Sequence, residues 1–149
     1  MNKRIVGVGA VCSAATLAMA VTYAQAAPIQ ETQGSAVVLH GGVGHEDRAA
    51  MEQKAKEHNL RLTFVRKGSG AYLSDVRVVI RDRKGAVLVD TVASGPWLFA
   101  NLPAGDYTVA ATAQGGTLTQ AIAIQGAARR DWVFRFDLPA GESAELNPK

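Results

Sequence analysis

From residue 60 onward, hydrophobic and polar positions alternate with a period of two, a pattern typical of half-buried β-strands. In the first such segment, Leu60, Leu62 and Phe64 alternate with Arg61 and Thr63. Similar segments, each bounded by Gly, Pro, Asp or Asn, occupy residues 76–81, 87–91, 97–101, 107–112, 118–124 and 132–137. Seven short strands with no long helix between them predict an all-β domain over residues 60–137, folded as an antiparallel sandwich or barrel.

The pattern is helical in only one segment, residues 45–59. This segment is rich in good helix formers. Glu46 and Asp47 fall in its first turn, where negative charge complements the helix dipole. Its apolar face is thin, with Met51 and Ala55 as its main members. We therefore predict one short helix that precedes the sandwich and packs loosely on a sheet or stands partly free.

The flanking segments lack a clear period. Residues 27–44 include Pro28 and a Gly-Gly-Val-Gly cluster, and this glycine density disfavours helix and strand interiors. We predict a flexible Gly-rich leader there, in which residues 36–39 could dock as an edge strand. Residues 138–149 contain two prolines and few apolar residues, and are predicted to form a frayed tail.

The first 26 residues have the order of a secretory signal peptide. Lys3 and Arg4 form a basic start, and residues 5–21 carry no charge. The residues around the expected cleavage site are small: Ala24, Ala26 and Ala27. A transmembrane anchor is the alternative, but the apolar run is slightly short, rich in Ala and Gly, and followed at once by the cleavage site.

Cleavage would change the composition of the protein. Cys12, the one cysteine, would be lost; it follows Val11 in the middle of the apolar run, which disfavours lipidation. Loss of Lys3 and Arg4 would lower the formal net charge from +3 to +1. We therefore expect a periplasmic or extracellular protein with no disulfide, no nucleic-acid partner and no stable membrane span after processing.

One stretch is more specific than the others. Residues 95–109 read GPWLFANLPAGDYTV, an aromatic-x-aromatic strand followed by Asn-Leu-Pro-x-Gly and x-Tyr-x-Val. The residues of this motif are Trp97, Phe99, Leu102, Pro103, Gly105 and Tyr107. Alternation places Trp97 with Phe99, and Tyr107 with Val109, on single strand faces, and we expect both pairs to enter a shared core.

This stretch, together with Leu-Ser-Asp-Val-Arg-Val at residues 73–78, resembles the carboxypeptidase regulatory-like domain family. The resemblance implies a transthyretin-like (prealbumin-like) seven-stranded Greek-key β-sandwich, used as an accessory module without catalysis. Residues 92–96 depart from the family pattern, since Val-Ala-Ser-Gly-Pro stands where Thr-Asp-x-x-Gly is common.

No metal or cofactor is predicted. His40, His45 and His58, with Glu46 and Asp47, form the one group that suggests a metal site. A helical pair of ligands needs a spacing of three or four residues, which these histidines do not have. Solvated side chains and a helix cap explain them better.

Aromatic residues offer a possible ligand platform. Trp132, Phe134 and Phe136 share one face of a strand, which is more typical of a core than of a binding surface. Trp97 follows Gly95-Pro96 at the start of a strand, where partial exposure would allow contact with a small ligand or glycan.

Basic residues gather on one predicted strand face. Arg77 and Arg81 point outward from their strand, and Arg61 is expected to point outward from its own. A solvated face that discourages edge pairing is one interpretation, and a patch for an anionic envelope polymer or lipid head group is the other.

Enzyme motifs are missing from the sequence: it contains no Gly-x-Ser-x-Gly, no His-Glu-x-x-His and no phosphate-binding loop. The serines lie in turn-like settings with no evident base nearby, at Ser35, Ser69, Ser74, Ser94 and Ser143. The Tyr-Arg-Gly-Ser ending of the transthyretin-like purine-pathway hydrolase is also missing. We expect a non-catalytic exported interaction or structural module of the cell envelope, with an unknown envelope protein as partner. The alternative is a small-ligand or glycan-binding domain centred on Trp97. The oligomeric state is left open.

Overall fold

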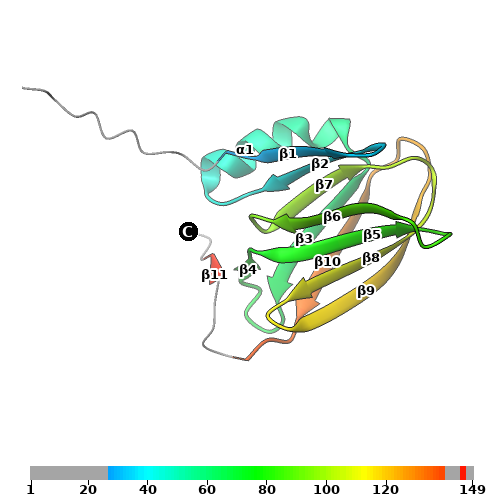
Figure 1. Cartoon of the computed structure of the whole chain (residues 1–149). Helices are drawn as coiled ribbons and strands as arrows, with labels where there is room; N and C mark the ends of the chain where they lie inside the picture. The colour runs from blue at the N-terminus through cyan, green and yellow to red at the C-terminus, as the bar shows by residue number, and fades with distance from the viewer. Residues whose placement is uncertain (1–26, 140–144, 147–149) are drawn as a thin grey trace, which may run out of the picture.

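The computed structural model describes residues 27–139 and 145–146. These residues form two β-sheets and one short helix (Figure 1). The predicted signal peptide, residues 1–26, lies outside the described part of the chain. The all-β prediction is confirmed at this level, since the described fold is mostly strand with two packed sheets.

The first sheet has seven strands and the second has four. The first sheet runs in the order β1 (Ile29–Gln33), β2 (Ala36–Gly41), β7 (Trp97–Asn101), β3 (Leu60–Arg66), β4 (Tyr72–Leu73) and β11 (Glu145–Leu146), and β10 (Arg130–Phe136) also pairs with β3. The second sheet runs in the order β6 (Val87–Ala93), β5 (Val76–Asp82), β8 (Gly105–Ala113) and β9 (Gly116–Ile124).

Each of the seven segments predicted as strands is a strand in the structure, with ends displaced by two residues at most. The prediction of a purely antiparallel fold is wrong at β10. This strand runs parallel to β3 along its whole length, from Arg130 opposite Leu60 to Phe136 opposite Arg66. Alternation along a strand reports which face is buried but not the direction of the neighbouring strand, so the sequence could not reveal this pairing.

The prediction of a flexible leader is also wrong. Residues 29–41 form the β1–β2 hairpin, and β2 lies between β1 and β7 rather than at an edge (Figure 1). Ala36 and Val38 are completely buried in the core between the sheets. Gly34 lies in the hairpin turn, Gly41 is the last residue of β2, and Gly42 and Gly44 follow it, so the glycines interrupt no strand interior.

The predicted tail is only partly described. Glu145–Leu146 pairs antiparallel with Tyr72–Leu73, so this short piece is paired rather than frayed. Residues 140–144 and 147–149 lie outside the described part of the chain.

The helix begins where the sequence predicts. Helix α1 spans His45–Lys54 and continues as a 3-10 turn at Ala55–Glu57. Met51 and Ala55 pack with Leu39, Trp97 and Phe99 on the face of the first sheet that is turned away from the second sheet. The thin apolar stripe is therefore a complete packing surface. The first sheet is therefore covered on both faces at β7, and four of the five residues of this strand are buried.

This arrangement corrects the expected shared core. Trp97 and Phe99 lie in the small cluster beneath the helix. Tyr107 and Val109 lie in the main core between the sheets, and β7 contributes Leu98 to this core. Alternation assigned each pair to one face correctly, but in β7 the other face turns toward the second sheet.

Within residues 27–139 and 145–146, no helix has the length and apolar character needed to cross a membrane.

Candidate functional site

The two sheets are open on one side, where β9 ends one sheet and β10 ends the other. Among the described residues, β9 pairs only with β8 and β10 pairs only with β3. The chain passes from β9 to β10 through residues 125–129, and the two strands are close near this connection without forming a ladder. Two free backbone edges therefore face the same opening.

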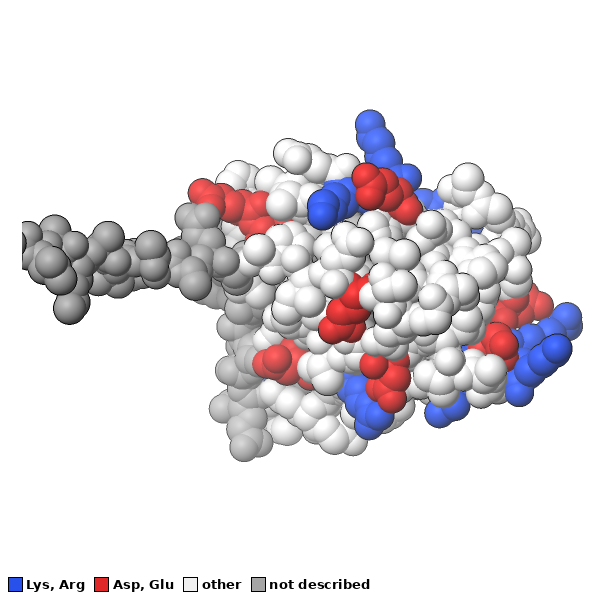
Figure 2. Space-filling view, turned by 45° about the horizontal axis from the view of Figure 1, so that its top comes forward, with Lys and Arg blue, Asp and Glu red and all other residues white. Residues whose placement is uncertain are grey.

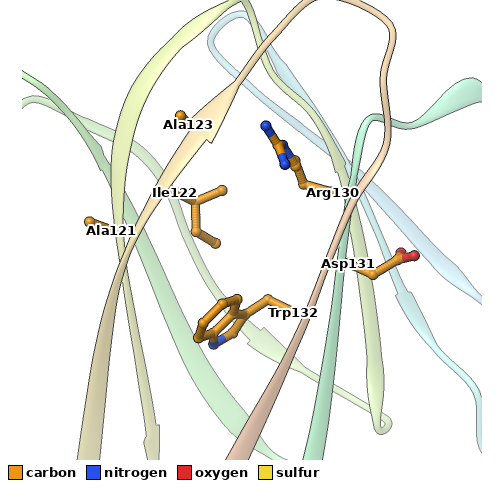
Figure 3. Close-up of a pocket in the computed structure, with 6 residues that line it drawn as sticks. All are labelled: Ala121, Ile122, Ala123, Arg130, Asp131 and Trp132. Atoms are coloured by element: carbon orange, nitrogen blue, oxygen red, sulfur yellow. The ribbon is translucent and has the colours of Figure 1, made fainter.

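A groove of about 330 Å³ lies in this opening. It is lined by Ala121, Ile122, Ala123, Arg130, Asp131 and Trp132. Ile122 from β9 and Trp132 from β10 point toward each other across it, whereas Asp131 points away (Figure 3). Trp132 is 40% exposed, so much of its ring is available to a bound molecule.

Two charged side chains line the groove, and they differ in whether they form an ion pair. Asp131 forms an ion pair with Arg129, with 3.3 Å between Oδ1 and Nε. The backbone N–H of Arg130 donates to Asn59 O at 2.8 Å, which anchors the start of β10. Within the described part of the chain, no hydrogen bond or ion pair involves the guanidinium of Arg130. The groove thus combines an exposed indole with a cation available for an anionic group.

The sequence analysis assigned Trp132 to the core, and this assignment is wrong. Phe134 and Phe136 on the same face are buried, and Phe134 stacks on Phe64 with 6.0 Å between ring centroids. The face of β10 is covered only along its second half. The sequence shows that a strand face is apolar, but it does not show whether the opposing sheet covers that face along its whole length.

The expectation that Trp97 is exposed is also wrong. Its side chain is 6% exposed and stacks on Phe99 with 6.1 Å between centroids. The guanidinium of Arg61 lies over the indole at 4.5 Å, so the ring is closed to a ligand. Arg61, predicted to point into solvent, instead lies beneath the helix and reaches Glu52 at 3.7 Å.

Arg77 and Arg81 lie on the solvated face of the second sheet, as predicted. Arg77 donates two hydrogen bonds to Asp90, and this contact lowers the pKa of the Asp90 carboxyl and raises that of the guanidinium. Arg81 donates to the carbonyl of Gly85. In Figure 2, acidic and basic residues are interspersed on the visible face. These local partners disfavour a continuous basic patch.

The histidines do not converge. No group of three or more His, Cys, Asp or Glu residues that could hold a metal occurs within the described residues. His40 and His58 are buried, contrary to the expectation of solvated side chains. Nδ1 of His58 lies 2.9 Å from Lys54 O at the end of the helix.

The sequence analysis found no base near Ser94, yet the fold brings His40 to it. The Ser94 hydroxyl lies 3.0 Å from His40 Nδ1, and the Ser94 backbone N–H donates to the same nitrogen at 3.2 Å. Nδ1 therefore acts as an acceptor, and Nε2 carries the proton toward Glu31 Oε1 at 3.6 Å. Because the backbone N–H already uses the lone pair that a general base needs, this chain of contacts ties strands together rather than activating Ser94.

The same contacts keep Glu31 in its carboxylate form. A hydrogen bond from the Thr91 hydroxyl, 2.8 Å from Glu31 Oε2, is the main cause that lowers its pKa, and Gln33 and His40 add to the effect. The Glu31–Thr91 contact connects β1 of the first sheet to β6 of the second, and the His40–Ser94 contact connects β2 to the residue after β6.

Comparison with protein-family models and with curated proteins finds no match to this chain.

Proposed function

We propose that this protein is an exported, non-enzymatic interaction module of the cell envelope that binds an extended segment of a partner protein along the free edge of β9. The observation that supports this most directly is the open side of the sandwich, where an unpaired edge strand borders a groove with an exposed tryptophan. Strand addition to a free edge supplies backbone hydrogen bonds, and neighbouring pockets supply selectivity. Export rests on the signal-peptide pattern of residues 1–26.

The edge of β9 lacks the features that usually protect an edge strand. Its nine residues, Gly116–Ile124, include no charged residue and no proline, and one side-chain contact, from Gln120 Nε2 to Ala121 O at 3.0 Å, covers a carbonyl of this strand. The opposite edge of the same sheet is protected. There, the side-chain amide of Gln33 donates to Asp90 O at 3.1 Å and accepts from Asp90 N at 2.8 Å, occupying backbone groups of β6. This contrast between the two edges favours β9 as the edge that remains available for pairing with a partner strand.

The groove indicates which partner residues would fit. Trp132 and Ile122 offer an apolar contact for one partner side chain, and Arg130 offers a charge to an acidic neighbour. We therefore expect a partner segment that is mostly uncharged along β9 and carries an apolar residue near an acidic residue at the groove.

Kinship with the carboxypeptidase regulatory-like domain is part of this proposal. In support, the Tyr107 hydroxyl donates to Pro103 O at 2.6 Å across the Pro-x-Gly turn of the motif. Asn59 also binds both backbone groups of Leu102, at 2.9 and 2.7 Å, and so fixes the start of this turn. The additional strands and the parallel β3–β10 pair depart from a seven-stranded antiparallel domain.

Site-specific photocrosslinking tests the proposal in intact cells. A photoreactive residue at Thr119, on the exposed outer face of β9, is expected to give a reproducible adduct with one protein. The matched control is Thr108, which is exposed on the same face of the sheet but lies on the inner strand β8. Adducts of equal yield at both positions, or none at Thr119, would overturn the proposal.

A second candidate function is binding of a small ligand or glycan in the groove alone, since about 330 Å³ is within the lower range of ligand sites. The substitution Thr119→Lys separates the two functions. It should weaken binding of an extended partner but leave a groove-bound ligand unaffected, whereas Trp132→Ala should weaken both.

A further inference from the structure

One oxygen of a buried carboxylate has no hydrogen-bond partner among the described residues. Asp47, in the first turn of α1, is 5% exposed. Its Oδ2 accepts hydrogen bonds from the backbone N–H groups of Gly42 and Val43. Its Oδ1 is buried without a hydrogen-bond partner among the described residues, and no ion pair there neutralises the charge. Such an oxygen is costly to bury, so a donor is expected to reach it.

The N-terminal segment passes directly beside this carboxylate. A Cβ built on Gly41 would lie 3.3 Å from Asp47 Oδ1 and also 3.3 Å from the Cα of Pro28. Pro28 and the carboxylate therefore adjoin the same point. Consecutive Cα atoms are about 3.8 Å apart, so Ala27 is one residue step away from this point.

The register of the hairpin places Ala27 on the same side. Ile29 is opposite His40 in the β1–β2 pair. If this register continues, Pro28 is opposite Gly41 and Ala27 is opposite Gly42, the residue whose N–H binds Asp47.

We propose that the α-ammonium group of Ala27, created by signal-peptide cleavage, binds Asp47 Oδ1 and completes the fold. Hydrolysis of the Ala26–Ala27 bond consumes one water and leaves a carboxylate on Ala26 and an ammonium on Ala27. The ammonium offers a positive charge and three donors to the buried oxygen. In the precursor the same nitrogen is an uncharged amide within a continuing chain. Processing therefore stabilises the mature fold through a contact that the precursor lacks.

A four-protein comparison tests the inference, which rests on the proposed export. Residues 27–149 contain every described element, so the mature chain can be released from a fusion with either Ala27 or one additional glycine as its first residue. Each form is made with Asp47 and with Asp47→Asn. The added glycine is expected to lower the melting temperature by roughly 3–6 °C with Asp47 present and to have little effect with the asparagine variant. Equal shifts in both backgrounds would overturn the inference.

Amine labelling gives a second readout that needs no folded Asp47 variant. The α-amino group of the Ala27 form should react with an acylating reagent about tenfold more slowly than that of the glycine-extended form, because a paired ammonium is a poor nucleophile. Equal rates would contradict the pairing. The mass of the protein recovered after export gives a further check: a first residue other than Ala27 would exclude the contact while leaving the interaction module untouched. Failure of crosslinking at Thr119 would instead overturn the proposed interaction module and leave the Ala27–Asp47 contact untouched.

Discussion

At the residue scale, the two tryptophans lie in environments opposite to those that the sequence suggests. Trp97 was expected to be partly exposed and is buried, whereas Trp132 was expected in the core and is partly exposed. Trp97 lies between β7 and the helix, with Arg61 over one face of its ring and Phe99 beside it. Its contacts help to attach the helix, whose Met51 and Ala55 pack in the same buried cluster. Trp132 lies across the groove from Ile122 of β9 and is 40% exposed, so its ring is available to the groove.

Matched alanine substitutions measure this difference. Trp97→Ala should lower the free energy of unfolding by about 3–5 kcal/mol, because it removes a large buried side chain. Trp132→Ala should change it by less than about 1 kcal/mol, because the ring is already partly in water. Urea unfolding followed by circular dichroism gives both values. A larger loss for Trp132 than for Trp97 would contradict the assignment of core and groove.

The lowered pKa of Glu31 makes stability depend on pH. Because the folded pKa lies below the unfolded value of 4.5, the carboxylate stabilises the fold fully above that value and loses its effect as the pH falls through the folded pKa. Stability should therefore decline on acidification below about pH 4.5, and Glu31→Gln should flatten this part of the curve. Unfolding measured between pH 3 and 7 checks the slope. An unchanged slope would show that Glu31 does not titrate with folding.

At the scale of elements, the close approach of two backbones fixes how β2 meets β7. A Cβ on Gly95 would lie 2.2 Å from the carbonyl oxygen of Gly41, a distance that no side chain tolerates. The conformation of Gly42, with a φ of +94°, then turns the chain toward the helix. The glycines of this region serve the crossing of two ordered segments rather than flexibility.

A pair of glycine substitutions tests this crossing. Gly95→Ala should destabilise the protein by about 1–3 kcal/mol, because β2 and the residues before β7 must separate. Gly116→Ala is the control, since the nearest atom to its added Cβ is Ala113 O at an ordinary 3.6 Å. Thermal unfolding of the two variants should differ clearly, and equal midpoints would argue against a tight crossing.

At the scale of the whole molecule, the β1–β2 hairpin holds the two sheets together. Gln33 binds the backbone of Asp90, Glu31 binds Thr91, and His40 binds Ser94. The hairpin also contributes Ala36 and Val38 to the core between the sheets. Its loss would leave β7 as an exposed edge and uncover both cores.

Removal of the hairpin is therefore expected to abolish cooperative folding. A chain starting at His45 should lack a sharp thermal transition, whereas the chain starting at Ala27 should unfold in one step by circular dichroism and by tryptophan fluorescence. A cooperative transition in the shortened chain, with a similar midpoint, would restore the interpretation of residues 27–44 as a dispensable leader.

The local sequence determined seven of the eight strands that lie within residues 60–137, the position of the helix and the interior faces of most strands. Period-two alternation and turn residues such as Asp82 and Gly85 depend on neighbours a few positions away, so they can be read directly. The same alternation could not show that β10 runs parallel to β3, or that Trp97 and Leu98 face different cores.

Only the tertiary structure decided which surfaces are covered. Trp132 is left partly exposed at the open side of the sandwich, the helix closes over Trp97, and β2 enters a sheet despite its neighbouring glycines. These outcomes depend on how far one element extends over another, which strand spacing does not encode. The candidate site was missed for this reason, since an unpaired edge and an uncovered ring are properties of the assembled sheets.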